Sequence, residues 1–205
     1  MRAFIYTGGE IFADNITEHP KGDDLRIAAD SGYKNAQLLG ERIDIFVGDR
    51  DSFDGELPSS VEKIELKPEK DLTDTQVAVE VAIEKGADDI VIVGGLSGRL
   101  DHTMSNIGIL RDAKLRGVHA YIVDGNNRVR YIKNDSLLIA KSGYKYLSLV
   151  CDSEIAKGVE VKGVKYPLER ATLKANFQYA VSNEIDGNCA LVAVKKGALL
   201  VIESR

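Results

Sequence analysis

The segment that organises this sequence is GGLSGRLDH, residues 94–102. It follows the β-branched run IVIV at residues 90–93 and precedes a stretch with helical spacing. Glycines let the main chain approach phosphate oxygens closely, and Arg99 has the planar fork that binds one phosphate through two N–H groups. The spacing is neither that of a Walker A loop nor that of a dinucleotide loop. The segment therefore predicts an anion-binding loop of another kind.

Two acidic loops lie upstream, GDRDS at residues 48–52 and KDLTD at residues 70–74. With the end of the glycine-rich segment they supply five carboxylates: Asp49, Asp51, Asp71, Asp74 and Asp101. Magnesium takes hard oxygen ligands and meets proteins through carboxylates plus substrate phosphates. Aspartate is also an ordinary turn and helix-capping residue, and that reading stays open for Asp71 and Asp74. Because three such loops recur beside apolar runs, we favour a polyphosphate held by magnesium.

The bulk composition describes a soluble globular protein. The chain has 205 residues, 44% hydrophobic and 29% charged, and a net charge of −5. This acidity argues against general nucleic-acid binding, which needs a basic surface. We expect no signal peptide, no membrane span and a cytoplasmic protein. Cys151 and Cys189 are expected to be free, core-type thiols rather than a disulfide.

The first half alternates strand-like and helix-like segments. Strands are expected at residues 2–6, 26–29, 43–47, 63–66, 90–93 and 118–123. Helices are expected at residues 31–39, from Thr73 to Gly86 with Thr73 and Gln76 as a capping box, and at residues 102–116. This alternation predicts an α/β domain with a parallel, doubly wound sheet.

In such a sheet, ligands bind beyond the carboxyl ends of the strands. Asp30, Asp49, Asp51, Gly94 and Gly95 all fall at strand ends. We therefore expect these loops to converge on one crevice.

After residue 125 the sequence changes to short strands separated by Gly, Asn and Asp turns. This pattern predicts an all-β sandwich, so we place two domains at residues 1–125 and 126–205. A short helix is possible at residues 167–173, and residues 195–198 (KKGA) look like a hairpin connection.

With these residues in hand, the chain resembles the bacterial thiamine pyrophosphokinase family. GDRDS stands where that family shows Gly-Asp-Phe-Asp-Ser, KDLTD matches Lys-Asp-x-Thr-Asp, and GGLSGRLDH matches Gly-Gly-x-Gly-Gly-Arg-x-Asp-His. Asn106, the ADSG of residues 29–32, the GVKYPL of residues 163–168 and the SNE of residues 182–184 also resemble family motifs. The resemblance covers nearly the whole chain.

The resemblance implies transfer of the diphosphate group of ATP to the hydroxyethyl group of thiamine, giving thiamine diphosphate and AMP. It also implies a homodimer with sites between subunits, a nucleotide-binding first domain and a thiamine-binding second domain. The expected thiamine residues are Tyr166, Ser182 and Asn183, although Tyr166 alone would read as a core residue.

The remaining site expectations combine residue chemistry with the resemblance. Mg²⁺ is expected on Asp49, Asp51, Asp71 and Asp74, and these residues act in catalysis together with Arg99 and Asp101. Any of Asp71, Asp74 and Asp101 can orient the thiamine hydroxyl. The expected nucleotide contacts are Asp30, Gly94, Gly95, Arg99, His102 and Asn106, with His102 equally readable as a helix-start residue.

Three residues depart from the family pattern: Arg50 replaces Phe, while Ser97 and Ser31 each replace Gly. Arg50 puts a cation beside the expected metal ligands. The serines matter only if their positions require positive φ, which costs serine more than glycine.

Two alternatives remain open. One is a magnesium-dependent nucleotide hydrolase or a diphosphokinase for another alcohol, because the loops specify phosphate rather than acceptor. The other is a nucleotide-binding regulatory module without turnover, for which Arg50 is the suspicious feature.

Overall fold

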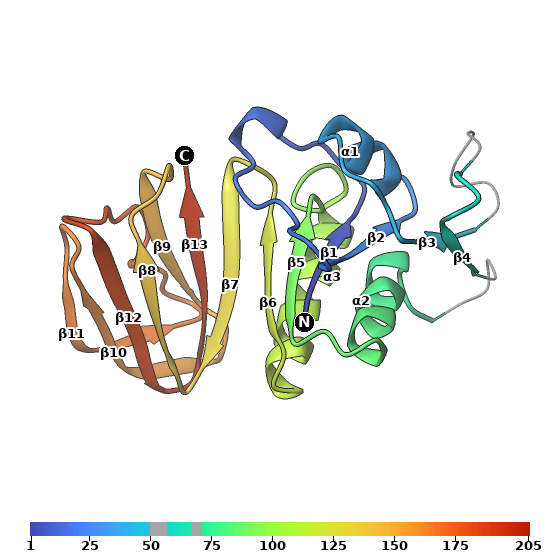
Figure 1. Ribbon diagram of the computed structural model, residues 1–205. Coiled ribbons are helices and arrows are strands. Elements are labelled where there is room, and N and C mark those ends of the chain that lie inside the picture. Colours follow the sequence, from blue (N-terminus) through green and yellow to red (C-terminus); the bar gives the residue numbers. More distant parts are fainter. Residues whose placement is uncertain (50–56, 67–70) are drawn as a thin grey trace. The chain divides into compact units, whose positions relative to one another are not determined.

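A computed structural model describes residues 1–49, 57–66 and 71–205. The chain forms two compact units, Met1–Gly125 and Asn126–Arg205 (Figure 1). Each unit has its own core.

The first unit is built on a parallel sheet. Its strands in the described ranges are β1 (Arg2–Tyr6), β2 (Leu25–Ala29), β3 (Ile45–Gly48), β4 (Glu62–Glu65), β5 (Asp89–Val93) and β6 (His119–Val123). They run in the order β4-β3-β2-β1-β5-β6, and each neighbouring pair is parallel. The central strands are buried because helices cover them, which explains the continuous apolar run of β5.

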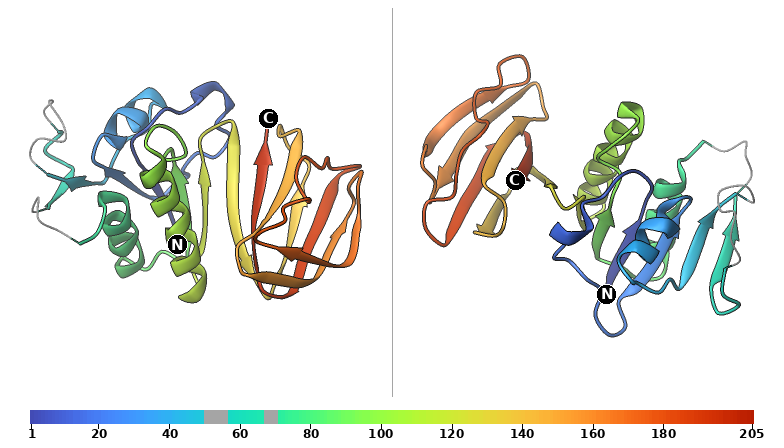
Figure 2. Two further views of the ribbon diagram at one scale, coloured as in Figure 1. Left: turned by 180° about the vertical axis from the view of Figure 1, so that it is seen from behind. Right: turned by 90° about the horizontal axis from the view of Figure 1, so that it is seen from above.

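Three helices flank this sheet: α1 (Gly32–Leu38), α2 (Asp74–Glu84) and α3 (Leu100–Leu115). A short 3₁₀ helix spans Ala13–Asn15. Figure 2 shows α1 on one side of the sheet and α2 with α3 on the other. The capping box expected at Thr73 and Gln76 is present and begins α2. The expected parallel sheet with helices is thus confirmed.

Strand order places β1 between β2 and β5. From β1 the chain moves outward through β2, β3 and β4, then returns to the other side of β1 with β5 and β6. The connection after β1 therefore leads to β2 on one side of β1, and the connection after β5 leads to β6 on the other side. Such a switch point is where open α/β sheets bind ligands.

The second unit consists of antiparallel strands. They are β7 (Asn127–Lys133), β8 (Ser136–Ala140), β9 (Tyr146–Cys151), β10 (Ile155–Lys162), β11 (Leu168–Lys174), β12 (Cys189–Lys196) and β13 (Ala198–Ser204). One layer has the order β7-β13-β9 and the other β11-β10-β12-β8. Both layers contribute side chains to one core, including Leu149 and Val201 from the first and Val159 and Val192 from the second.

Two expectations for this unit were wrong, and a third was right only in part. The possible helix at residues 167–173 is strand β11, because its alternating side chains pair with β10. Residues 195–198 do not connect a hairpin, because β12 pairs with β10 and β8 while β13 pairs with β7 and β9. Cys151 and Cys189 are both free as expected, but only Cys151 is buried.

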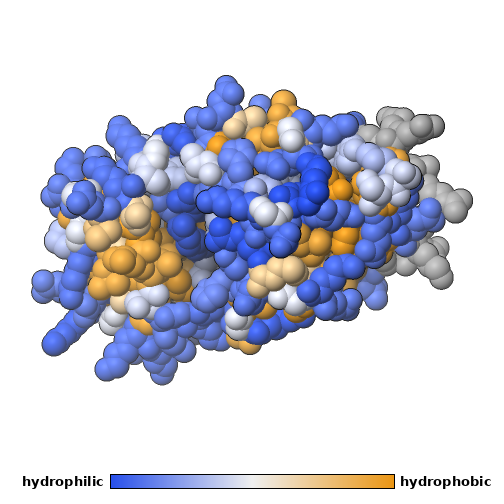
Figure 3. All heavy atoms as spheres, in the orientation of Figure 1, coloured by the Kyte–Doolittle hydropathy of each residue, from blue (hydrophilic) through white to orange (hydrophobic). Residues whose placement is uncertain are grey.

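The surface view in Figure 3 is mostly hydrophilic, with apolar areas between the polar residues. Leu138, on the outer side of β8, is 68% exposed. No helix in the described ranges has the length and apolar character needed to cross a membrane.

Candidate active site

A cleft of about 440 Å³ lies at the switch point of the parallel sheet. Its walls come from the loops after β1, β2 and β5 and from the beginnings of α2 and α3. The lining residues are Thr7, Gly8, Gly9, Ala29, Asp30, Ser31, Thr73, Asp74, Thr75, Gly95, Ser97, Gly98, Arg99, His102 and Asn106. Of the strand-end residues expected to converge, Asp30 and Gly95 line this cleft, Asp49 and Gly94 are not among its described lining residues, and Asp51 lies outside the described residues.

The floor of the cleft is held by amide and hydroxyl side chains. Asn35 donates through Nδ2 to the carbonyl oxygens of Thr7 (2.8 Å) and Gly9 (2.9 Å). The hydroxyl groups of Thr7 and Thr75 lie 2.8 Å apart in a buried hydrogen bond. These contacts tie the β1 loop to α1 and α2.

Gly94 and Gly95 allow the loop after β5 to pack closely against its neighbours. Their backbone φ angles are +97° and +76°, and a Cβ on Gly95 would lie 2.4 Å from Asn106 Nδ2. The Gly94 N–H donates to the Val123 carbonyl at 2.8 Å, and the Gly95 N–H donates to the Gly8 carbonyl at 3.1 Å. Both donors expected to face phosphate are therefore used within the protein.

Asp30 directly follows β2 and has a φ of +52°, a conformation that L-residues other than Asn and Asp rarely adopt. Its N–H donates to the Val47 carbonyl and its carbonyl accepts from the Tyr33 N–H, which hold this backbone geometry. Strained backbone of this kind concentrates at functional sites. The carboxylate of Asp30 lines the cleft.

The acidic loops contribute unequally. Asp74 is the first residue of α2 and lines the cleft, next to the Thr73 cap. Asp71 precedes the helix, is exposed and is not among the described lining residues. Asp49 follows β3 and is half-buried, while Arg50 and Asp51 lie outside the described residues.

Arg99 and Asp101 form an exposed ion pair at the start of α3. Arg99 Nη2 lies 2.6 Å from Asp101 Oδ2, and Arg99 Nε lies 3.2 Å from Oδ1. The hydrogen bond from Arg99 holds the pKa of the Asp101 carboxyl below its usual range. Asp101 is therefore engaged with Arg99 through both of its carboxylate oxygens.

His102 and Asn106 both line the cleft from α3. The His102 N–H donates to Asp101 Oδ1 at 3.0 Å, and Asn106 Nδ2 donates to the Gly95 carbonyl at 2.9 Å. Asn106 is buried. This amide therefore braces the glycine-rich loop rather than offering that donor to a ligand.

The donor chemistry of the cleft fits a magnesium ion. Asp30 and Asp74 bring carboxylate oxygens to one cavity, and magnesium commonly uses one or two carboxylates plus substrate phosphates. No group of three or more His, Cys, Asp or Glu side chains suited to a metal occurs within the described ranges.

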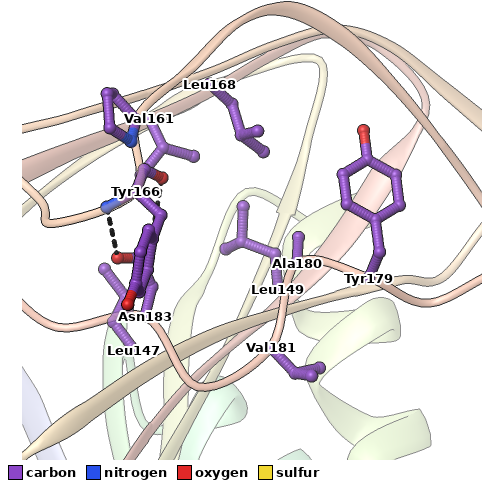
Figure 4. Close-up of a pocket in the computed structure, with 10 residues that line it drawn as sticks. Leu147, Leu149, Val161, Tyr166, Leu168, Tyr179, Ala180, Val181 and Asn183 are labelled. Atoms are coloured by element: carbon purple, nitrogen blue, oxygen red, sulfur yellow. Dashed lines mark hydrogen bonds between the residues drawn. The ribbon is translucent and has the colours of Figure 1, made fainter.

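A second cavity, of about 170 Å³, lies in the β unit (Figure 4). Tyr166 and Tyr179 stand on opposite sides of it, with Leu147, Leu149 and Val161 among the aliphatic residues of its wall. Of the three residues expected to bind thiamine, Tyr166 and Asn183 line this cavity.

The Asn183 side chain bonds the backbone of Tyr166 in both directions. Its Oδ1 accepts from the Tyr166 N–H at 3.0 Å, and its Nδ2 donates to the Tyr166 carbonyl at 2.7 Å. Ser182 has a φ of +59°, and its N–H donates to Ser148 Oγ at 2.9 Å. Asn183 thus holds the backbone of Tyr166, while Ser182 ties its own segment to Ser148.

Several cleft residues were not expected as site residues: Thr7, Gly8, Gly9, Ser31, Thr73, Thr75 and Ser97. The signal in the sequence was the Gly8-Gly9 pair directly after the first strand. Ser31 has a φ of −59° and Ser97 is not among the residues with positive φ, so neither serine carries that strain.

The fold and the cleft define a class of protein in which a parallel α/β unit, with a cleft at its switch point, precedes an antiparallel β unit. The chain belongs to the thiamin pyrophosphokinase family. The model for the thiamin pyrophosphokinase catalytic domain matches residues 17–122, and the model for the vitamin B1 binding domain of thiamin pyrophosphokinase matches residues 136–199. This family consists of diphosphotransferases that convert thiamine to thiamine diphosphate.

Individual relatives agree. The chain is 31% identical over 137 residues to the thiamine pyrophosphokinase of Bacillus subtilis, an alignment that spans 66% of this chain and 64% of that protein. The crystal structure of thiamine pyrophosphokinase from Bacillus subtilis superposes with a TM-score of 0.87 at 26% identity, covering 100% of this chain and 99% of that one. The Geobacillus thermodenitrificans thiamin pyrophosphokinase structure gives a TM-score of 0.83 at 25% identity, covering 100% and 98%.

Proposed function

We propose that this chain is an ATP-dependent thiamine diphosphokinase. The observation that carries the proposal is the cleft at the β1/β5 switch point, where Asp30, Asp74 and Arg99 share one cavity. Membership of the thiamin pyrophosphokinase family supports thiamine as the acceptor.

In the reaction, the hydroxyethyl oxygen of thiamine forms a bond to the β-phosphorus of ATP. The bond from that phosphorus to the oxygen bridging the α-phosphate breaks, and AMP leaves with the bonding electron pair. The hydroxyl proton passes to a carboxylate or to water. Such transfers depend mainly on positioning and electrostatics, so a strong base is not required.

The charged groups of the cleft divide this work. Arg99 neutralises charge on the transferring diphosphate. Asp101 orients the Arg99 guanidinium through two hydrogen bonds. Asp74 orients the thiamine hydroxyl, because it lines the cleft while Asp71 is exposed and Asp101 is engaged with Arg99.

Magnesium, when bound, would neutralise phosphate charge. Asp74 would hold it together with one or more of the other carboxylates, Asp30, Asp49, Asp51 and Asp71. Asp30 joins the four expected ligands because its carboxylate lines the same cavity. His102 and Asn106 support the nucleotide loop in this proposal.

Thiamine binding is assigned to the β unit. Thiamine is an aromatic cation, and the exposed Tyr166 ring offers a π face for it at the mouth of an apolar cavity. Lys165 Nζ lies 5.6 Å from the centroid of that ring, within the range of a cation–π contact. Asn183 keeps the Tyr166 segment in place, and Ser182 holds the neighbouring segment through Ser148.

We also propose the division into a nucleotide unit, residues 1–125, and a thiamine unit, residues 126–205, in a cytoplasmic homodimer. Phe177, Tyr179 and Val181 of the second unit are exposed, and clustered exposed apolar residues mark association surfaces. Light scattering after size-exclusion chromatography measures the mass; a monomer at micromolar concentration would reject the dimer.

Incubation with ATP, Mg²⁺ and thiamine tests the function directly. Formation of AMP and thiamine diphosphate in equal amounts is expected, and no AMP should form without thiamine. ADP or free phosphate would instead indicate a hydrolase. Unchanged ATP together with measurable ATP binding would indicate a regulatory module.

The role of Asp74 is tested with Asp74→Asn, which keeps the size of the side chain. We expect turnover to fall by at least about 100-fold, as for loss of one electrostatic contact at the reacting group. Glu84→Gln, an exposed position on the same helix, is the matched control and should keep full activity. Equal turnover rates in the two variants would mean that Asp74 acts only as a helix-capping residue.

A further inference from the structure

The tips of the β1 and β5 loops are joined by one serine hydroxyl. Ser97 Oγ accepts a hydrogen bond from the Glu10 N–H at 2.7 Å and lies 3.1 Å from the Glu10 carbonyl oxygen, to which it donates. A single side chain thus satisfies both backbone groups of a residue 87 positions away.

The loops approach closely at this point. Gly9 has a φ of +94°, and a Cβ there would lie 3.0 Å from Ser97 Oγ and 3.3 Å from the Ser97 carbonyl. Deeper in the cleft the same two loops meet through the bond from the Gly95 N–H to the Gly8 carbonyl. Ser97 therefore adds a second link farther along both loops.

Both linked loops line the cleft. Gly8 and Gly9 come from one loop, and Ser97, Gly98 and Arg99 come from the other. The chain between Gly95 and the start of α3 carries Arg99, so its position depends on what holds the loop tip. Without the Ser97 hydroxyl, the Glu10 N–H and carbonyl would lose their common partner.

We propose that Ser97 is a positioning residue that holds the two loops in their nucleotide-binding arrangement before the nucleotide arrives. The inference rests on the proposed function, because it takes the ligand of the cleft to be the polyphosphate of ATP. Its hydroxyl is occupied by Glu10, so Ser97 acts through the loops and not on the reacting atoms. Preordered loops raise affinity because binding no longer has to order them.

The opposite role is physically distinct. If the Ser97 hydroxyl masks the Glu10 N–H from phosphate, its removal frees a main-chain donor and strengthens nucleotide binding. Weaker ATP binding after removal of the hydroxyl therefore indicates that Ser97 positions the loops. Stronger ATP binding indicates that the hydroxyl blocks the Glu10 N–H.

The test compares the intact protein with Ser97→Ala, Ser97→Gly and Ser97→Thr. We expect Ser97→Ala and Ser97→Gly to raise the KM for ATP about 10-fold, equivalent to about 1.4 kcal/mol. The KM for thiamine should stay within about twofold, because a positioning role concerns only the nucleotide side. Ser97→Thr keeps a hydroxyl and should have a KM for ATP close to that of the wild type. Ser59→Ala, at an exposed position outside the cleft, is the control and should not change this KM.

Two measurements without turnover separate this inference from the proposed function. Calorimetry with a non-hydrolysable ATP analogue should show the same loss of affinity in Ser97→Ala, and NMR-detected hydrogen exchange of the Glu10 amide should be faster. If wild-type protein forms no thiamine diphosphate, the proposed function fails while these two measurements still decide on Ser97. Unchanged Glu10 exchange, or unchanged or tighter analogue binding, overturns the inference.

Discussion

Asp30 combines a carboxylate in the cleft with a left-handed backbone, and the two properties can be separated by substitution. Asp30→Asn keeps tolerance for positive φ, and Asp30→Gly favours it, but both remove the charge. We expect both variants to stay within about 1 kcal/mol of the wild-type unfolding free energy. Turnover should fall by about 100-fold in each.

Urea unfolding and steady-state assays measure these two effects. A large loss of stability with little loss of turnover would make Asp30 a turn residue. Asp30→Ala also removes the charge, but it has neither the freedom of glycine at positive φ nor the short polar side chain with which Asn tolerates this region, and it should be the least stable of the three variants.

The pair of Arg99 and Asp101 makes a prediction about ionisation. Arg99 stabilises the charged form of Asp101 and thereby lowers the pKa of its carboxyl. In Arg99→Gln that pKa should rise toward the ordinary value for aspartate, and added salt should shrink the difference between the proteins, because the pair is exposed. Titration of the Asp101 carboxyl carbon by NMR measures both effects.

Lys114→Gln, which removes a positive charge from the last turn of the same helix, serves as the control. It should leave the Asp101 pKa unchanged. Equal pKa values in wild type and Arg99→Gln would mean that the two side chains separate in solution.

Helix α2 depends on its capping box. Thr73 Oγ1 accepts from the Gln76 N–H at 3.2 Å, and Gln76 Oε1 accepts from the Thr73 N–H at 2.9 Å. Thr73→Ala should lower the unfolding free energy by about 1 kcal/mol, since it leaves a donor in the first turn without its partner. Thr73→Ser should retain most of the stability; equal urea midpoints for Ala and Ser would refute the cap as a source of stability.

The passage from β12 to β13 depends on Gly197. Its φ is +111°, and a Cβ there would lie 2.6 Å from the Ile155 carbonyl oxygen. Gly187 has a nearly equal φ of +109°, but no atom of the described residues lies within 4 Å of the place a Cβ would take, which makes it a matched control. Gly197→Ala should therefore lower the melting temperature more than Gly187→Ala.

Differential scanning calorimetry of both variants gives the comparison. The difference between them isolates the steric contact, because the backbone strain is shared. Identical melting temperatures would mean that the β10 backbone moves aside without cost.

The β unit has a buried charge cluster whose loss would affect the whole chain. Glu203 is 1% exposed and pairs with Arg128 at 3.3 Å and with Arg130. Glu203→Gln leaves two guanidinium groups without their common carboxylate, so we expect about 3 kcal/mol loss of stability.

The exposed pair of Glu160 and Lys162, 3.0 Å apart, is the control for this substitution. Glu160→Gln should change the unfolding free energy by less than about 1 kcal/mol. Chemical denaturation of both variants checks the prediction. An equally small effect of Glu203→Gln would mean that water solvates the charged groups of the cluster.

Sequence patterns predicted most elements because their causes are local. The apolar run before Gly94, the cap at Thr73 and the positive-φ glycines after the helices, Gly40, Gly86 and Gly117, act over a few residues. The wrong helix at residues 167–173 arose from a segment with weak periodicity, where pairing with β10 outweighs intrinsic preference.

The sequence predicted several of the residues that line the cleft, but not how the structure arranges them. Asp30, Asp74, Arg99, His102 and Asn106 line the cleft as expected. The first four follow a strand end or stand at a helix start, whereas Asn106, inside α3, was expected from the family resemblance. The β1 loop was missed as part of the site because Gly8 and Gly9 read as an ordinary turn. The thiamine assignments, by contrast, came from family resemblance.

By itself, the sequence determined most of the strands and helices, which carboxylates stand at strand ends, and where the composition changes. Tertiary structure alone decided that β1 lies beside β5, that the N–H groups of Gly94 and Gly95 are used internally, and that Gly197 joins two layers. The reason is physical: hydrophobic periodicity and caps depend on neighbours in the chain. Strand order and loop contacts depend on partners far away in it, which local patterns do not specify.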